Sequence, residues 1–458
     1  MKNLQSANGA YFSHGTPSVR SQGTKRRRSW LLTLRVLLLA LFLLSIYTQV
    51  SLYVGFVIPS TFTLLILMPL LALMYYRRIY KYELFFVGQV FLILLLTAFL
   101  SPGLEYLDQK LLGLIQTIAS IIGGILLLKL VSNLPNQWLA RTLLALWVVL
   151  LVGAALEVVG VLTGVSDAFR EAAYGQGEGT YGIYDSSSRD TELIGHERPK
   201  LFTSEPSFLA IGFFAFINSW LIVAYSQRNL FVACMATLLM LGLSGSPILF
   251  LSLSVSIIVM LFSENRVDYS VLALASICLV VLAAAYIRSD IASDFMVRAS
   301  DAYQNAGSAT HLGSENRRLF FPFITVVDVI KNSPLFGIGI SGKELVADYS
   351  SLPLDPEAAM GDNALAMFFM YCGLVGSPLF IKAVYDYWRR MRIDQIMLLV
   401  VPILALSQTM GGFETPRFWG YTFLFVAVMW KRSTSRHSTP ATSSGNQSQP
   451  RHAHSSAL

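Results

Sequence analysis

The chain has 458 residues, of which 54% are apolar and only 13% are charged, and its formal net charge is +7. Soluble domains carry about a quarter charged residues, so this chain has too little charge to cover a water-facing surface of its size. The composition excludes a soluble multidomain enzyme, an intrinsically disordered chain and a nucleic-acid-binding protein, and it predicts a polytopic membrane protein.

The first predicted span follows a polar segment, residues 1–28, that ends in four consecutive basic residues. The apolar run from Trp30 to Tyr47 continues through Thr48 and Gln49 into a second apolar run. A signal peptide would instead end in a small-residue cleavage site. We therefore expect a retained helix whose basic start lies in the cytoplasm.

Further apolar runs complete an all-α fold of about twelve transmembrane helices, each needing roughly 20 residues to cross the bilayer. Residues 29–163 hold helices 1–5, residues 206–287 hold helices 6–9, and residues 363–430 hold helices 10–12. The individual spans are predicted at 30–47, 51–75, 83–100, 111–131, 139–163, 206–225, 229–244, 246–262, 269–287, 363–383, 395–411 and 417–430.

Basic residues fall in alternate connections between the spans and so predict the orientation. The connections with this bias are 77–81, 133–141, 227–228, 265–266 and 389–392, and the final segment begins Lys431-Arg432. By the positive-inside rule these lie in the cytoplasm. Both termini are then cytoplasmic, and two long loops, 164–205 and 288–362, lie on the extracytoplasmic side of the membrane. The tail 431–458 is disordered by composition.

Several kinds of function lack support in the sequence. The three cysteines lie in apolar runs without paired spacing, so we expect no disulfide framework and no zinc site. We also expect no cofactor and no other metal. Within the spans, Lys129 and Glu157 are the main ionisable candidates, and each is near an end. A transporter normally has costly ionisable residues at mid-bilayer depth. An enzyme acting on a lipid-linked substrate is favoured, with a lipid-linked oligosaccharide transporter as the alternative.

The first polar cluster lies where the first long loop enters a span, and it contains Arg198, Lys200 and Glu205. Glu205 is followed by Pro206, which suits the first position of a helix because proline has no amide to leave unpaired. Glu205 is therefore either a helix cap or a carboxylate held at the membrane boundary beside two cations.

The second cluster consists of Arg317 and Arg318, which precede an apolar run. Paired arginines at an interface often anchor lipid headgroups, but arginine also grips phosphate through two parallel hydrogen bonds. A metal-free enzyme with a lipid pyrophosphate leaving group needs such a clamp.

The third cluster, Asp362-Asn363, opens the tenth span. Asp362 is a suitable helix N-cap, and it is equally a carboxylate that can face an acceptor sugar hydroxyl.

The order of these clusters on twelve spans with two long outer loops resembles the O-antigen polymerase (Wzy) and O-antigen ligase superfamily. The matching pieces cover roughly residues 190–380 and are Arg198 to Ser207, Arg317-Arg318, Asn332 to Gly339, Asp362-Asn363 and Gly373 to Gly376. The resemblance implies a C-type glycosyltransferase architecture that uses undecaprenyl-pyrophosphate-linked oligosaccharides at the outer leaflet of a bacterial inner membrane, with the long loops and the active site facing the periplasm. A chain-length regulator protein is a candidate partner beside the lipid bilayer.

The resemblance also favours one branch. Ligases of the superfamily typically have a histidine just before the asparagine that opens the late span, and this chain has Asp362 there. We therefore expect a polysaccharide polymerase for O-antigen or exopolysaccharide, with a ligase to lipid A-core or protein as the nearer alternative.

In the expected reaction an acceptor hydroxyl attacks the anomeric carbon of the donor glycan, and undecaprenyl pyrophosphate leaves. Glu205 or Asp362 accepts the hydroxyl proton. The residues expected to bind the pyrophosphate and stabilise its growing charge are Arg198, Lys200, Arg317, Arg318 and Arg417. One displacement inverts the anomeric configuration, and no metal takes part.

Overall fold

The computed structural model describes residues 20–53, 57–58, 60–174, 196–246, 248–263, 321–351, 363–393 and 396–438. Apart from one two-stranded hairpin, its elements are helical. In chain order they are α1 (Arg20–Thr48), β1 (Leu52–Tyr53), β2 (Val57–Ile58), η1 (Thr63–Leu67), α2 (Met68–Tyr75), η2 (Tyr76–Arg78), α3 (Lys81–Leu100), η3 (Leu104–Tyr106), α4 (Leu107–Ser132), α5 (Asn136–Val158), α6 (Thr163–Tyr174), α8 (Pro206–Val223), α9 (Gln227–Ser244), α10 (Ile248–Ser263), α13 (Phe321–Asn332), α14 (Glu344–Tyr349), α16 (Ala364–Arg390), α17 (Met397–Thr409) and α18 (Pro416–Ser438).

Seven of the described helices are long and apolar enough to cross a membrane, and they belong to α1, α3, α4, α5, α8, α9 and α16. Two shorter apolar helices, Ile248–Val259 and Leu398–Thr409, lie within α10 and α17. The chain is therefore an all-α polytopic membrane protein, as its composition predicts. The span predicted at 269–287 lies outside the described residues.

The second predicted span differs from the structure at its start. Leu52 pairs with Ile58 and Tyr53 with Val57 in an antiparallel hairpin, and helical structure resumes only near Thr63. Pro59 explains the difference, because the residue before a proline is driven toward extended backbone. The helical part of this span is correspondingly shorter than the apolar run.

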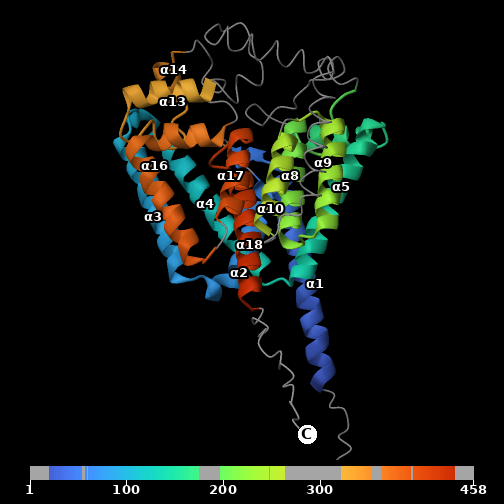
Figure 1. Cartoon of the computed structure of the whole chain (residues 1–458). Coiled ribbons are helices and arrows are strands. Elements are labelled where there is room, and N and C mark those ends of the chain that lie inside the picture. The colour runs from blue at the N-terminus through green and yellow to red at the C-terminus, as the bar shows by residue number, and fades with distance from the viewer. Residues whose placement is uncertain are drawn as a thin grey trace, which may run out of the picture.

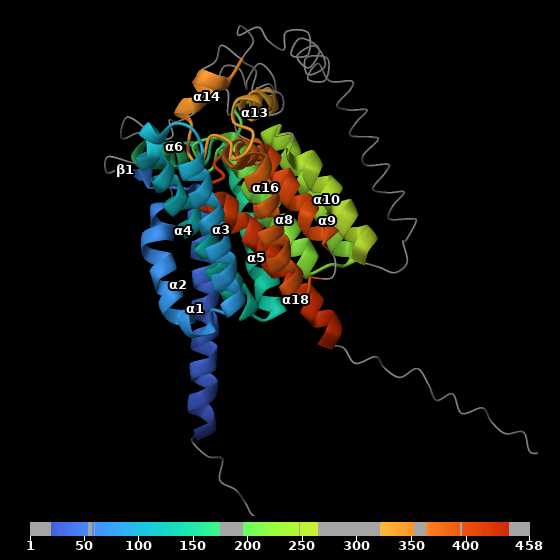
Figure 2. The ribbon, with the colours of Figure 1, turned by 90° about the vertical axis from the view of Figure 1, so that its left-hand side faces the viewer.

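The bundle has two ends of different character (Figure 1). The N-terminal part of α1 and the C-terminal part of α18 project from the same end, which we call the basic end. There Arg78 donates to the Asn133 side chain and Lys431 to the Leu134 carbonyl. At the opposite end, called the loop end, lie α6, α13 and α14 (Figures 1 and 2).

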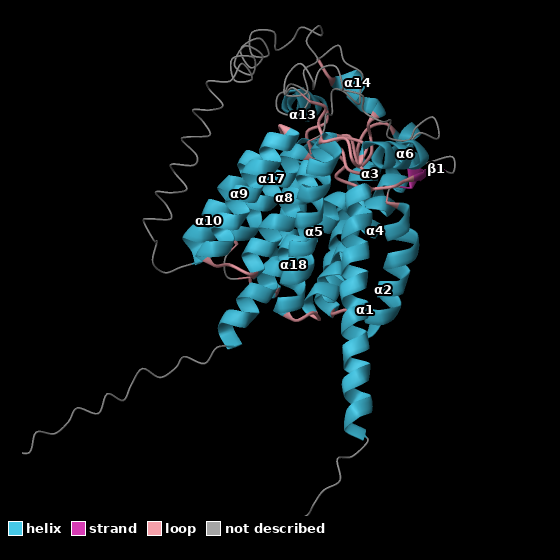
Figure 3. Cartoon of the chain, turned by 90° about the vertical axis from the view of Figure 1, so that its right-hand side faces the viewer, coloured by secondary structure: helices cyan, strands magenta, loops and turns pink. Residues whose placement is uncertain are grey.

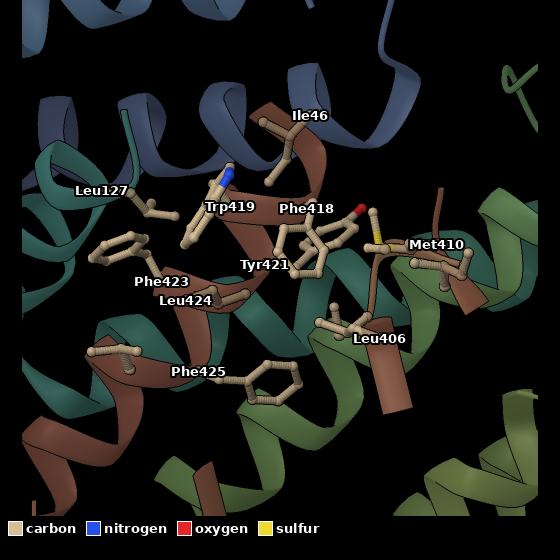
Figure 4. Close-up of a cluster of buried hydrophobic side chains, with 14 of the residues drawn as sticks. Ile46, Leu127, Leu406, Met410, Phe418, Trp419, Tyr421, Phe423, Leu424 and Phe425 are labelled. Atoms are coloured by element: carbon tan, nitrogen blue, oxygen red, sulfur yellow. The ribbon is translucent and has the colours of Figure 1, made fainter. Parts of the chain in front are cut away.

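Helix α18 is central to the packing. Its side chains from Phe418 to Met429 are almost all buried, and Figure 4 shows several of them between α1, α4, α8 and α17. Gly124 of α4 lets the helices approach closely, because a Cβ there would meet the Phe423 ring at 2.2 Å. The helix that carries Arg417 at its start is thereby fixed against much of the bundle (Figure 3).

One buried ion pair lies at the basic end. Lys129 lies 2.5 Å from the Glu83 carboxylate, and both side chains are buried. The Lys129 ammonium also lies 3.9 Å from the centre of the Tyr80 ring. Lys129 is therefore accounted for by a local ion pair between α3 and α4.

Candidate functional site

The described members of the expected site all lie at the loop end. Arg198 and Lys200 precede α8, Glu205 stands directly before its first residue, and Arg417 is the second residue of α18. Arg317, Arg318 and Asp362 lie outside the described residues. Their described chain neighbours Phe321 and Asn363 are both buried.

A strained turn lies between Arg198 and α8. Leu201 and Phe202 have φ angles of 35° and 63°, in a left-handed region that costs roughly 1–2 kcal/mol for each residue with a side chain. The Glu157 carboxylate, at the end of α5, accepts hydrogen bonds from the amides of Lys200 at 3.0 Å and Leu201 at 2.7 Å. The carboxylate thus satisfies two backbone donors that the turn brings together.

Glu157 is itself held by α6. Its second oxygen accepts a hydrogen bond of 2.8 Å from Arg170, in an ion pair with both side chains buried. Arg170 also donates to the Ser166 hydroxyl at 2.6 Å, and that hydroxyl accepts the Phe202 amide at 3.2 Å. Helix α6 therefore supports the turn through a chain of buried polar contacts.

Two tyrosines bind the carbonyls of the same turn. Tyr47 of α1 donates to the Leu201 carbonyl at 2.7 Å, and Tyr174 of α6 donates to the Phe202 carbonyl at 3.0 Å. Burial raises the pKa of Tyr174 to about 12, against the opposing charges of Arg417 and Arg170. The phenol stays protonated near neutral pH and remains a hydrogen-bond donor.

Arg417 joins the first and last helices of the bundle. Its Nε donates to the Ile46 carbonyl at 3.0 Å and its Nη2 to the Tyr47 carbonyl at 2.9 Å. The guanidinium lies 3.9 Å from the centre of the Phe208 ring, and the residue is 3% exposed. Because Phe208 lies one turn after Glu205 in α8, the contact fixes the Arg417 charge near the start of α8.

Glu205 and Lys200 make local contacts. The Ser207 hydroxyl donates to the Glu205 carboxylate at 2.9 Å, and the Glu205 carbonyl accepts the Phe208 amide at 3.2 Å. The Lys200 ammonium lies 2.9 Å from Glu197. Glu205 therefore stands at the helix start with its side chain directed to a hydroxyl rather than to a capping amide.

In a second element of the site, the glycine-containing turn between α13 and α14 forms hydrogen bonds with a break in α16. Helix α16 is interrupted at Gly373, whose φ is 62° and ψ is −166°. The turn before α14 bonds to the backbone groups freed by this break: Leu374 donates to Pro334 at 2.8 Å, Val375 to Leu335 at 2.9 Å, and Ile338 to Met370 at 2.9 Å. Unpaired backbone groups are costly in a membrane. The pairing therefore explains why the chain has a glycine at the break in α16 and a glycine-containing turn that lies against it.

The loop between α17 and α18 connects this turn to the rest of the bundle. The Ser341 hydroxyl donates to the Glu414 carboxylate at 3.0 Å, and the Ser120 hydroxyl donates to the Glu414 carbonyl at 2.7 Å. Glu414 is 6% exposed. Nearby in sequence, the Met410 carbonyl accepts the Ala364 amide at 2.8 Å. The loop between α17 and α18 thus contacts α4, α16 and the turn before α14.

Asn363 caps α16. Its side-chain oxygen accepts the Ala366 amide at 3.0 Å, and its side-chain nitrogen donates to Gln408 at 3.0 Å. The capping role considered for Asp362 is thus performed by its neighbour. The cap also fastens the start of α16 to α17.

Asp328 of α13 anchors the end of α14. Its carboxylate accepts the Ser351 amide at 2.9 Å and the Ser351 hydroxyl at 2.6 Å. Burial acts to raise the pKa of Asp328, but the bonds from Ser351 and the charge of Lys331 outweigh it and hold the pKa below its ordinary value. The anchor is therefore formed with an ionised carboxylate.

A lowered pKa gives this anchor a defined pH dependence. Its stabilisation is present above the unfolded pKa of about 4 and is lost as pH falls through the lower folded pKa. We expect hydrogen exchange of the Ser351 amide to stay slow, relative to its unprotected rate, from pH 7 to 5. Asp328→Ala should abolish this protection throughout, since the bonds to a charged acceptor are worth about 1.5–3 kcal/mol each. Unchanged protection in Asp328→Ala would exclude the anchor.

Several functional candidates were not singled out from the sequence. Glu157 is noted there only as an ionisable residue near the end of a span, and Arg170, Tyr47 and Tyr174 are not identified as partners of the first cluster. Glu414 lies in the same short turn as Arg417. An acidic and a basic residue together in so short a connection between apolar runs are the signal that could have found it.

The arrangement provides fixed cations and carboxylates at one end of the bundle. Buried positive charge stabilises an anionic leaving group, and a carboxylate accepts a proton from a hydroxyl. Within the part of the chain that the structure describes, no group of three or more metal-binding side chains is present.

One comparison with known proteins gives a match. A family model described as O-antigen ligase (Wzy_C) matches residues 230–381. The matched segment runs from α9 into α16 and includes the turn that pairs with the break at Gly373. No curated protein matches the chain.

Proposed function

We propose that this chain is a polysaccharide polymerase that carries out glycosyl transfer at the membrane. The match of residues 230–381 to a family model described as O-antigen ligase supports the proposal. The proposed polymerase joins oligosaccharide repeat units that are linked to undecaprenyl pyrophosphate. The growing glycan is transferred from one lipid carrier to the non-reducing end of a repeat on another.

The observation that carries the proposal is the gathering of buried charge at the loop end. Arg170, Arg417, Glu157 and Glu414 are each less than a tenth exposed there. They hold the segment before α8 and the loop before α18 in fixed positions. A transferase needs such preorganised charge where the leaving group becomes anionic.

In the proposed mechanism the acceptor hydroxyl attacks the donor's anomeric carbon and loses its proton to Glu205 or Asp362. Negative charge grows on the bridging phosphate oxygen as the carrier leaves. Arg317 and Arg318 stabilise that charge together with Arg198, while Lys200 and Arg417 contribute positive potential. The single displacement inverts the anomeric configuration without a metal.

The orientation is part of the proposal. Basic residues cluster at the end from which α1 and α18 project, and the positive-inside rule places that end in the cytoplasm of a bacterial inner membrane. The loop end then faces the periplasm. A chain-length regulator would meet the protein there.

A ligase is the second candidate, because the matching family model is described as O-antigen ligase. Donor and membrane context are the same, and only the acceptor differs. Ladder analysis of a deletion strain separates the two. A single repeat on the final acceptor identifies a polymerase, whereas full-length polymer retained on the carrier identifies a ligase.

The same strain tests the arginine clamp when it is complemented with variants. Arg317→Ala and Arg318→Ala should each leave short repeats on the carrier, with polymer reduced by about 10²-fold or more, as for loss of one transition-state donor. Lysine at either position should restore little, because it lacks the bidentate fork. Glycan ladders at matched protein levels provide the measurement.

Arg390→Ala is the matched control, since Arg390 ends α16 at the basic end. Its ladder should equal that of the wild type. Normal polymer in both clamp variants would contradict the clamp, and a retained anomeric configuration in the product would contradict the single displacement.

A further inference from the structure

The turn before α8 is unusual in its backbone. Leu201 and Phe202 are consecutive residues with side chains, and both have positive φ angles. Residues in such conformations persist only where the surroundings over-determine them, and they cluster at functional sites. The turn lies three residues after Arg198 and three before Glu205, between two residues of the proposed site.

Its surroundings hold the turn through its backbone. Glu157 accepts the amides of Lys200 and Leu201, while Tyr47 donates to the Leu201 carbonyl. Ser166 and Tyr174 hold the amide and the carbonyl of Phe202. Because these bonds go to the main chain, they fix where the turn lies without using the side chains of the proposed site.

The supporting groups come from three separate helices. Tyr47 belongs to α1, Glu157 to α5, and Arg170 to α6. The side chains of both Arg170 and Glu157 are buried. Their charges therefore attract each other in surroundings that screen charge weakly. Arg417 completes the arrangement by bonding the Tyr47 carbonyl at 2.9 Å.

We propose that Glu157, held by Arg170, is a positioning residue that fixes the turn at Leu201-Phe202 and thereby the placement of Arg198 and Glu205 for glycosyl transfer. The inference rests on the proposed function. It assigns Glu157 no contact with substrate. Its effect is on the rate of transfer, because a misplacement of about 1 Å at a reacting group can cost 10²-fold.

Glu157→Gln tests the inference. In the wild type one carboxylate oxygen accepts both amides and the other faces the Arg170 guanidinium. A glutamine has a single acceptor oxygen, so its amide nitrogen, a donor, must face either the guanidinium or the two amides, and one side of the arrangement loses its acceptor. For the purified variant in vesicles, with the carrier-linked repeat extracted from the deletion strain as substrate, kcat should fall about 10- to 100-fold. KM should change little, since the interaction is not with the substrate. Hydrogen exchange at the amides of Lys200 and Leu201 should be faster than in the wild type.

Glu83→Gln is the matched control, because Glu83 is also a buried carboxylate paired with a cation, Lys129, but lies at the basic end. It should retain the wild-type kcat even if its melting temperature falls as much as that of Glu157→Gln. Ser166→Ala removes a hydroxyl that accepts both the Phe202 amide and the Arg170 guanidinium. This variant should also lower kcat, and it provides the test if Glu157→Gln does not fold.

The outcomes separate the inference from the function on which it rests. A wild-type kcat in Glu157→Gln, unchanged exchange at Lys200 and Leu201, or an equal loss of kcat in Glu83→Gln would overturn the positioning role. A wild-type chain that extends no carrier-linked repeat would overturn the proposed function, and the exchange measurement still decides whether Glu157 holds the turn.

Discussion

Replacing Gly373 with alanine is expected to destabilise the late half of the bundle strongly. The residue has a φ of 62° and a ψ of −166°, and a Cβ there would meet the Gly337 nitrogen at 2.4 Å and the Leu335 carbonyl oxygen at 2.7 Å. Backbone strain alone costs about 1–3 kcal/mol, and the clash adds the loss of the bonds from Leu374 and Val375. We expect a fall in melting temperature and faster exchange at these two amides in detergent-solubilised protein.

Gly337→Ala should have a similar effect, because its Cβ would lie 2.0 Å from the Met370 carbonyl oxygen. Gly242→Ala is the control within a helix, where a Cβ meets nothing within 4 Å. That substitution should be neutral or stabilising by up to about 1 kcal/mol. A Gly373→Ala protein with wild-type melting and exchange would show that the break in α16 is dispensable.

Arg417→Ala is the second substitution with a large expected effect. It leaves the carbonyls of Ile46 and Tyr47 buried without their donor, at about 1–3 kcal/mol each, and removes the guanidinium stacked on Phe208. We expect the yield of folded protein to fall several-fold. Polymer per folded molecule should fall by about 10-fold or more, since the α1–α18 junction borders the turn at Leu201-Phe202. Arg417→Lys should recover only part of both, because a single ammonium does not reproduce two fixed donors and a planar face.

Arg432→Ala is a control on the same helix. Arg432 also donates to a backbone carbonyl, that of Ile222, but at 3.4 Å and at the basic end. Polymer yield per folded molecule should be unchanged. If Arg417→Lys gave full polymer, or if Arg432→Ala reduced polymer equally, the placement of Arg417 would not matter for transfer.

Much of the fold was predictable from the sequence because the bilayer imposes local rules. A spanning helix must satisfy its own backbone and be apolar along its length, so α1, α3, α5 and α8 are visible as apolar runs. The exception is the start of the second run, where Pro59 and the pairing of Leu52 with Ile58 replace helix by a hairpin.

The candidate site was predictable only as separate clusters. Arg198, Lys200, Glu205 and Arg417 were identifiable by residue type beside helix ends. Their supports were not, since Glu157 is 44 positions from Leu201 and the Arg417 side chain bonds a carbonyl 371 positions away. No periodicity or spacing in a single chain encodes such a pairing.

The sequence by itself thus determined the class of molecule, the course of most helices and the superfamily resemblance, because hydropathy, basic loops and short motifs are local properties. Only the tertiary structure decided that the sequence around Gly337 satisfies the break at Gly373 and that Glu157 and Tyr47 hold the turn at Leu201. Those outcomes depend on which buried donors and acceptors meet when the helices pack. In a membrane each such group must find a partner within the protein.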